Sequence, residues 1–416
     1  MLTTIHEISI IYLIQHVKGM VQLMKILYIE WNGLCANDVK ATLKALGHEY
    51  KTISTPDENK FERNENFQAA VEMTIKEYAP DLVFSMNFFP SVSMACYTYK
   101  IKYISWIYDN PQTAAYDYSV KNECNYIFSY DSYMVSQLQS RGVEHIYYAP
   151  MAVNAKRIGG MSILPEDVKR YTCDIAMVGS LYNESTDYYS ALIAKAHDDY
   201  LTGYLEGLLN SQKLVYGYNF MAEALPQDIV EKIRKDMGGL LPEQTLLTEQ
   251  EIYSDVFLSK KLATINRVEL LYMLGTYFDV HFFTYKETFI NNITHRGPID
   301  YNTEMPKLFK IAKINLNDTR RSNKCGIPLR AMDIMGCGGF LLSNFQEDFY
   351  RHFEPDVHMV MYGSIEEAID KSDFYLKHDT EREQIKQNAF EIMQRDHTYE
   401  IRLRQMFETA GLQPYI

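Results

Sequence analysis

Short apolar segments alternate with longer amphipathic segments from Met24 to about residue 150. Apolar runs of this kind predict buried strands, and the segments between them have helical periodicity. The predicted strands are 25–30, 49–54, 81–88, 102–109, 125–131 and 145–150, and the predicted helices are 37–47, 66–78, 91–99 and 131–141. Strands separated by helices of about ten residues indicate a parallel sheet built from right-handed βαβ units.

The same alternation restarts at "CDIAMVGSL" (173–181), after a linker that contains "GGMSILPED". Residues 187–255 then show helical periodicity without strands, which predicts a helical insertion. Further strands are predicted at 278–285, 313–317, 339–344 and 357–362, and helices at 261–276, 303–312, 327–336, 346–352, 364–377 and 379–412. A break in the last helix is expected near Asp396–His397.

These patterns divide the chain into four parts. They are an extension or extra helix at 1–23, a first α/β domain at 24–152, a second α/β domain at 153–396 with an insertion at about 187–255, and a C-terminal helix at 397–416. Two doubly wound domains that face each other place a ligand cleft between the carboxyl ends of both sheets.

Composition excludes several classes of protein. The net charge of −13 argues against a general nucleic-acid binder, because neutralising phosphates requires a basic face. The longest apolar run, near "ISIIYLIQHV", is too short to span a bilayer and lacks the features of a signal peptide. The six cysteines form no CxxC pair, which is typical of reduced thiols in a cytosolic protein. We therefore expect a cytoplasmic protein, with oligomerisation left open.

Positive charge is nevertheless concentrated in "NDTRRSNKCGIPLRAMDIMGCGGFLLSN" (317–344). Arg320, Arg321 and Arg330 lie around the predicted start of a helix, where unpaired backbone N–H groups favour an anion. Pro328 suits the first helical turn, and Gly326 would let the backbone approach a ligand. The spacing of Cys325 and Cys337 does not fit a zinc site. The stretch therefore indicates a phosphate-binding turn.

Asp333 lies one turn after Arg330 on a helix whose other residues are mostly small or apolar. A buried carboxylate needs a partner. Local chemistry leaves two partners open, which are Arg330 itself and the neighbouring hydroxyls of a ribose.

Other candidate residues follow predicted strands of the second domain. Gly179 and Ser180 end its first strand, where they either open onto the cleft or form a plain turn. Phe283 and Thr284 end the next strand, and the two-domain architecture of the family named below implies that they lie closest to a nucleotide base, although burial in the core explains the phenylalanines equally well.

The first domain offers a candidate base. Asp109, in "WIYDNP", lies at the end of a strand and could take a proton from an acceptor hydroxyl, or form an Asx turn instead. Glu30, a second candidate base, Asn32 and Gly33 follow the first strand and are expected at the cleft. This "EWNGLC" stretch is not a dinucleotide fingerprint.

A resemblance to a known family rests on "NLNDTRRSNKCGIPLRAMDIMGCGGFLLSN", on "GPIDYNTEMPKLFKIAKINLN" before it and on "HTYEIRLRQMFE" (397–408) after it. These runs resemble the C-terminal half of CgeB-type glycosyltransferases, GT-B enzymes first named from a spore-maturation protein. The N-terminal half, with "WIYDNP" at 106–111, is similar to the domain usually paired with that C-terminal half. The resemblance covers nearly all of the chain from Met24 onward except the insertion. It implies a GT-B fold of two Rossmann-like domains.

The resemblance also implies roles for individual residues. Asp333 would hold the ribose of a nucleotide-sugar donor. The donor diphosphate would be lined by residues of the preceding turn, namely Arg320, Arg321, Gly326, Pro328 and Leu329. Many retaining relatives have a second glutamate where this chain has Cys325, so the stereochemical outcome stays open.

The chain has no D-x-D pair, which metal-dependent sugar-nucleotide enzymes typically use. We therefore expect no metal and no cofactor, with cationic groups neutralising the leaving diphosphate. The predicted function is transfer of a sugar from a nucleotide-diphosphate sugar, UDP by analogy, to an acceptor of unknown class (glycan, protein or small molecule). The alternatives are a sugar-nucleotide epimerase on the same fold and a non-catalytic binding or assembly protein.

Overall fold

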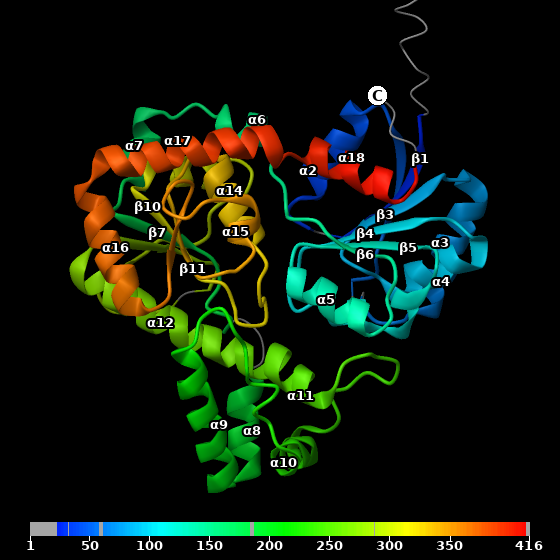
Figure 1. Ribbon diagram of the computed structural model, residues 1–416, viewed down its shortest axis with the longest axis horizontal. Helices are drawn as coiled ribbons and strands as arrows, with labels where there is room; N and C mark the ends of the chain where they lie inside the picture. The colour runs from blue at the N-terminus through cyan, green and yellow to red at the C-terminus, as the bar shows by residue number, and fades with distance from the viewer. Residues whose placement is uncertain (1–22, 32, 58–60, 184–186, 287, 413–416) are drawn as a thin grey trace, which may run out of the picture.

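The computed structural model describes residues 23–31, 33–57, 61–183, 187–286 and 288–412. It has two α/β halves side by side and a helical arm below them (Figure 1). The extension predicted at 1–23 lies outside the described residues except for Leu23. Within the described chain, no helix combines the length and the apolar character needed to cross a membrane.

The N-terminal half contains a six-stranded sheet in the order β2-β1-β3-β4-β5-β6, with every neighbouring pair parallel. Its strands are β1 (Lys25–Glu30), β2 (Glu49–Ser54), β3 (Leu82–Met86), β4 (Tyr103–Ile107), β5 (Asn125–Ser129) and β6 (Ile146–Tyr148). The connecting helices are α2 (Ala36–Ala45), α3 (Glu65–Tyr78), α4 (Pro90–Tyr99) and α5 (Ser132–Ser140). The βαβ prediction for this half is confirmed.

The second sheet is also parallel, in the order β12-β11-β10-β7-β8-β9. Its strands are β7 (Ile175–Val178), β8 (Val280–Phe283), β9 (Thr294–His295), β10 (Ile314–Asn317), β11 (Leu341–Asn344) and β12 (Val360–Tyr362). Its helices are α6 (Ala155–Gly159), α7 (Pro165–Tyr171), α13 (Met305–Ile311), α14 (Leu329–Gly336), α15 (Phe349–His352), α16 (Ile365–Lys377) and α17 (Asp379–Asp396). Strand β9 was not predicted, because its two residues are exposed and form no apolar run.

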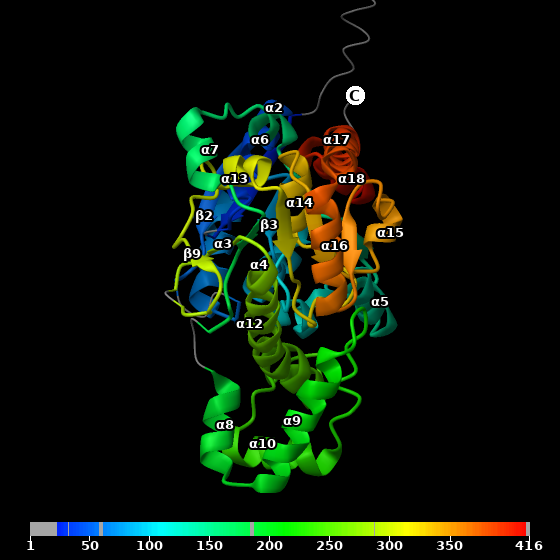
Figure 2. The same cartoon turned by 90° about the vertical axis from the view of Figure 1, so that its left-hand side faces the viewer.

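The insertion between β7 and β8 is helical, as its periodicity predicts. It consists of α8 (Tyr188–Ala196), α9 (Asp199–Lys213), α10 (Gln227–Met237), α11 (Glu249–Ile252) and the π-helical turn η3 (Tyr253–Leu258), which continues into α12 (Ser259–Tyr277). These helices bury a core of their own, which includes Leu201, Leu205 and Phe257. Seen from the side, the arm projects below the second sheet and α12 leads back to it (Figure 2).

The chain crosses between the two halves twice, at neighbouring places. The first crossing follows β6, and the second joins α17 to α18 (Tyr399–Thr409), which packs against α2 of the N-terminal half. A parallel bridge joins Val153 to Thr398, and the Val153 N–H donates to the His397 carbonyl at 3.0 Å. The predicted break near Asp396–His397 is confirmed.

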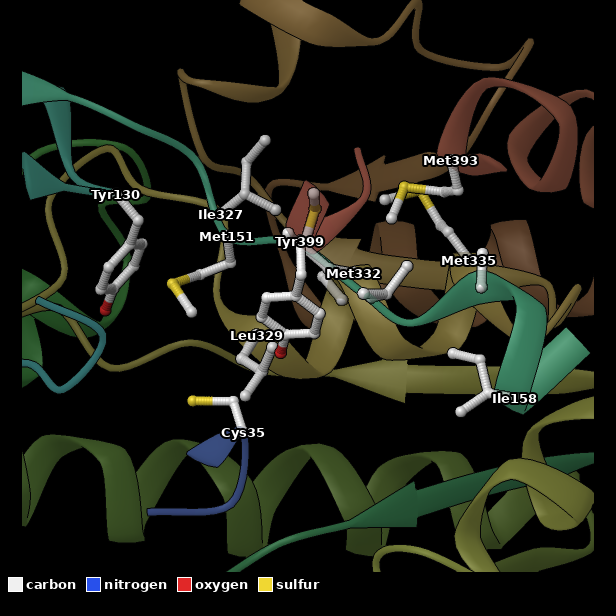
Figure 3. Packing of buried hydrophobic residues seen from close by; sticks show 14 of the residues in the cluster. Cys35, Tyr130, Met151, Ile158, Ile327, Leu329, Met332, Met335, Met393 and Tyr399 are labelled. Carbon is white, nitrogen blue, oxygen red and sulfur yellow. The ribbon is translucent and has the colours of Figure 1, made fainter. Parts of the chain in front are cut away.

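The two halves share one apolar cluster. Cys35 of the N-terminal half, Leu329 and Met332 of α14 and Tyr399 of α18 meet there (Figure 3). This shared cluster holds the carboxyl ends of the two sheets toward each other.

Candidate active site

A cavity of about 270 Å³ lies between the carboxyl ends of the two sheets. From the second half it is lined by the ends of β7 and β10, which are neighbours in the sheet although their connections run to opposite sides. Such a switch in strand order is where α/β sheets bind ligands. The lining residues are Tyr108, Asp109, Asn110, Tyr130, Met177, Val178, Gly179, Ser180, Tyr182, Arg267, Leu316, Asn317, Asp318, Thr319, Arg320, Asn323, Pro328 and Arg330.

Two arginines face one aromatic ring in this cavity. The guanidinium of Arg267 lies 4.5 Å from the centre of the Tyr182 ring, and that of Arg320 lies 5.0 Å from it. Tyr182 has a φ of +61°, which is uncommon for a bulky side chain and is found at functional sites. The arrangement concentrates two positive charges beside the turn that follows β7.

Arg267 is anchored by groups of the second half. It donates to the carbonyls of Ser180 and Asp318 and lies 3.5 Å from the Asp318 carboxylate. Gly179 precedes this turn with a φ of +157°, and a Cβ there would lie 3.5 Å from Arg267. Glycine therefore fits a backbone that runs close to the guanidinium.

The positive charge of Arg320 has fewer partners than that of Arg267. Its Nη2 donates to the Asp255 carbonyl and to Ser259 Oγ, both at 3.0 Å. In the part of the chain that is described, no carboxylate lies within ion-pair distance of it, and its buried Nε has no hydrogen-bond partner. Burial lowers the pKa of Arg320 below its usual value. A partly buried cation that lines a cavity without a carboxylate partner favours an anionic ligand, because the anion would compensate its lost hydration.

The opposite wall carries Asp109. The side chain of Asn87, which is fully buried with a φ of +64°, holds the loop after β4. Its amide nitrogen donates to Asp109 Oδ2 at 2.8 Å, and its oxygen accepts from the backbone N–H groups of Tyr108 and Asp109 at 3.1 and 3.2 Å. Asp109 is therefore a carboxylate of fixed orientation at the cavity, across from the arginines.

Several sequence-predicted residues do line this cavity. They are Asp109, Gly179, Ser180, Arg320, Pro328 and Arg330. Pro328 is the N-cap residue of α14 rather than part of its first turn, because the helix begins at Leu329. Arg330 lies over the Phe309 ring at 5.9 Å and contacts the Met305 sulfur.

The adjacent Arg321 points elsewhere. Its guanidinium lies 3.9 Å from the centre of the Tyr216 ring, and its Nε donates to the Val215 carbonyl. It does not line the cavity, although the sequence placed both arginines at one diphosphate. The pair "RR" diverges because the first side chain turns to the cavity and the second to the insertion.

Gly326 allows the two halves to pack closely against each other. A Cβ at this position would lie 2.7 Å from the Tyr130 ring and 2.9 Å from Asn323 Oδ1. The close approach expected of this glycine is therefore to Tyr130, a side chain of the N-terminal half. Leu329, another predicted diphosphate contact, is buried in the shared apolar cluster.

Asp333 is buried outside the cavity lining. Its Oδ1 accepts a hydrogen bond from the Tyr301 hydroxyl at 3.1 Å. Burial raises the pKa of Asp333 to about 7, while Arg330 and the Tyr301 hydrogen bond oppose the rise. Of the partners that the sequence left open, Arg330 acts as a nearby charge, and the ribose role stays a prediction.

Four other predicted residues, Glu30, Gly33, Phe283 and Thr284, do not line the cavity. Glu30 forms an ion pair with Lys40, and Gly33 lies beside Tyr108, whose hydroxyl would be 3.3 Å from an added Cβ. Phe283 is buried in the shared cluster, and Thr284 is buried with its N–H donating to the Gly297 carbonyl. Asn32 lies outside the described residues.

Sequence reasoning missed Arg267 and Tyr182. Arg267 lies at least 49 residues in sequence from every other cavity residue, inside a helix with no distinctive motif. Tyr182 follows "GSL" directly, and an aromatic residue two positions after a predicted cleft serine was the one signal that pointed to it. Among the described residues, no cluster of three or more His, Cys, Asp or Glu side chains is arranged to hold a metal ion.

Residues 259–408, which run from α12 to α18, match a family model described as "Glycosyl transferase-like". No curated protein matches the chain significantly. Among solved structures, a glycosyltransferase from Rickettsia africae ESF-5 is 12% identical, with 94% of this chain and 98% of that one covered and a TM-score of 0.52.

Two further structures are similar. Anabaena HepE in complex with UDP is 11% identical, with 94% and 100% of the two chains covered and a TM-score of 0.51. Sucrose-phosphate synthase from Thermosynechococcus elongatus is 11% identical, with 93% and 98% covered and a TM-score of 0.53.

The chain has the GT-B fold. Two facing parallel sheets, with a cavity between their carboxyl ends, are the GT-B arrangement that the sequence predicted. Its C-terminal part is glycosyltransferase-like by sequence as well. The finer resemblance to CgeB-type enzymes and the domain boundaries at 152 and 396 stay predictions.

Proposed function

We propose that the protein is a GT-B glycosyltransferase that moves a sugar from a nucleotide-diphosphate sugar to an acceptor hydroxyl. The observation that carries the proposal is Arg320, a partly buried cation without a carboxylate partner in the described chain, directed at a cavity between two facing sheets. A diphosphate placed there would accept hydrogen bonds from Arg320 and Arg267. The glycosyltransferase-like sequence of residues 259–408 supports the reaction class.

Each wall of the cavity would have its own chemical task. Asp109, oriented by Asn87, would take the proton from the acceptor hydroxyl as that oxygen attacks the anomeric carbon. The bond between the anomeric carbon and the diphosphate oxygen breaks in the same reaction. The arginines would stabilise the negative charge that appears on the leaving diphosphate, without a metal ion.

UDP is the favoured nucleotide in this proposal, because a structure of similar fold, HepE, was solved with UDP. The six free cysteines support a reducing compartment, and we propose the cytoplasm. The sugar and the acceptor stay open.

Thermal stability in the presence of UDP, GDP, ADP and CDP, and of their sugar conjugates, tests the proposal. A ligand at about 100 times its dissociation constant stabilises the folded state by roughly 2.7 kcal/mol. We expect one nucleotide class to raise the melting temperature, with or without EDTA. A shift that EDTA abolishes would contradict metal independence. No shift with any nucleotide would favour the non-catalytic alternative.

A further inference from the structure

Residues 244–251 of the insertion, here called the strap, contact the N-terminal half. The Tyr118 N–H donates to the Gln244 carbonyl at 3.1 Å, and the Leu246 N–H donates to the Tyr116 carbonyl at 2.7 Å. Asp117 and Thr245 form an antiparallel bridge between them. The side chain of Leu246 packs against the apolar core of the N-terminal half. The strap is thus attached by backbone pairing and by apolar burial.

Gln137 of α5 and Arg141, the C-cap residue of that helix, add a polar attachment. Arg141 forms an ion pair with Glu251 and donates to the Leu246 carbonyl at 2.6 Å. Gln137 Nε2 donates to Glu251 Oε1 at 2.7 Å. Glu251 Oε2 accepts from the Thr248 backbone N–H at 2.8 Å and closes a capping box at the start of α11. One carboxylate therefore begins the helix and joins it to the other half.

The same helix leads directly to the donor side of the cavity. One turn after Glu251, the π-helical turn η3 presents the Asp255 carbonyl, and α12 then presents Ser259 Oγ. Both oxygens accept from Arg320 Nη2. The π-helical turn widens the helix at this point, as is common at functional sites. The Asp255 carboxylate lies 3.5 Å from Lys324 Nζ, so the loop that carries Arg320 is attached a second time.

We propose that the strap positions Arg320 for the donor diphosphate. Glu251 and Arg141 fix the insertion on the N-terminal half, and the continuous helix from α11 through η3 to α12 holds the guanidinium through Asp255 and Ser259. When the two halves approach each other, the strap therefore places the Arg320 guanidinium in the same movement. Glu251 and Ser259 are positioning residues in this account, and the proposal rests on the proposed donor site.

A neutral residue at position 251 tests the attachment of the strap to Arg141 without disturbing the start of α11. Glu251→Gln keeps the capping box, which accepts glutamine, and removes the charge that pairs with Arg141. Glu249→Gln is the matched control, because Glu249 lies on the same helix and pairs with Arg234 within the insertion. The probes are UDP and uridine, which differ in the diphosphate alone.

Calorimetric titration should show weaker UDP binding for Glu251→Gln, by roughly five- to ten-fold, at the lower end of coupling between sites. Uridine binding should be unchanged, because only the phosphate contacts depend on Arg320. In an Arg320→Gln background, Glu251→Gln should have no further effect, since coupled residues are not additive. Equal losses for UDP and uridine, or additive losses in the double variant, would overturn the proposal. So would a UDP loss of the same size in Glu249→Gln.

Small-angle scattering separates this proposal from the proposed function. Glu251→Gln and Arg141→Gln are expected to have a larger radius of gyration than the wild type and Glu249→Gln, with no ligand present. If wild-type protein binds no nucleotide, the donor site fails while the larger radius would still support the attachment by the strap. An unchanged radius in both variants would overturn the attachment itself.

Discussion

At the scale of single residues, two adjacent arginines with the same chemistry have different surroundings. Each has a buried guanidinium nitrogen without a partner, but Arg320 lines the cavity, while Arg321 stacks on Tyr216 away from it. An incompletely paired charge is costly in the free protein, and at Arg320 the cavity leaves room for a ligand that would pair with it.

Exchanging each arginine for glutamine tests this difference. Arg320→Gln should weaken UDP binding by roughly ten- to hundred-fold, because it removes charge-assisted hydrogen bonds worth about 1.5–3 kcal/mol. Arg321→Gln is the control and should bind UDP as the wild type does. Calorimetric titration of both variants gives the answer. Equal losses in the two would show that the local charge matters and the orientation does not.

Asp333 gives a pH-dependent prediction. Burial raises its pKa to about 7 in the folded protein, whereas an aspartate in an unfolded chain ionises near pH ~3.9. Between these values the folded state holds a proton that the unfolded state has lost, so stability falls as pH rises through this window. Asp333→Asn cannot ionise and should lose less stability from pH 4 to 7. The melting temperature of the variant, measured relative to that of the wild type, should therefore rise from pH 4 to pH 7.

Groups near Asp333 define what would contradict this expectation. Asp38 raises its pKa further, while Arg330, Arg157 and Tyr301 oppose the rise. If the melting temperatures of variant and wild type run parallel from pH 4 to 7, Asp333 is ionised throughout and is compensated by these cations.

At the scale of elements, the last helix belongs with the half that begins the chain. Helix α18 buries Leu403, Met406 and Phe407 in the shared cluster, and Tyr399 at its start lies 6.0 Å from Trp106, centre to centre. Arg402 donates to the Pro150 carbonyl and Lys102 to the Ala410 carbonyl. These contacts attach the helix to the N-terminal half.

Leu403→Ala should destabilise that half by roughly 2–5 kcal/mol, as large-to-small changes in a core do. Both tryptophans, Trp31 and Trp106, lie in the N-terminal half, so their fluorescence reports on its unfolding. We expect denaturant to change the fluorescence of this variant at a lower midpoint than in the wild type. Leu308→Ala, in α13 of the second half, is the control and should lower the midpoint of circular dichroism more than that of fluorescence. The reverse order would assign α18 to the second half.

At the scale of the whole molecule, alternation of apolar and amphipathic segments was enough to predict two parallel sheets and the helical insertion. Short apolar runs indicate buried segments, and the positions of these segments along the chain indicate where the strands lie. Strand β9 and the shared core were beyond this reasoning, since β9 is exposed and the core joins residues such as Cys35 and Tyr399 that are far apart in sequence.

The site was predicted in part for the same reason. Residues that directly follow strands, such as Asp109 and Gly179, could be placed because parallel strands end at one edge. Arg267 could not, because it lies in the middle of helix α12, where no strand end places its side chain. The opposite directions of Arg320 and Arg321 could not be predicted either, because each guanidinium lies over a tyrosine ring, Tyr182 or Tyr216, that only the folded chain brings beside it.

The chain crosses between the halves only near Val153 and Thr398 in the described residues, so a rotation of one half against the other would have its axis there. In Figure 1 this axis lies near α6, α17 and α18, while α11 and the strap lie toward the opposite end of the molecule. Displacement in a rotation grows with distance from the axis. A small turn at the crossings would therefore shift the strap much farther than the shared core, and would open the cavity at its charged end while its apolar end stayed packed.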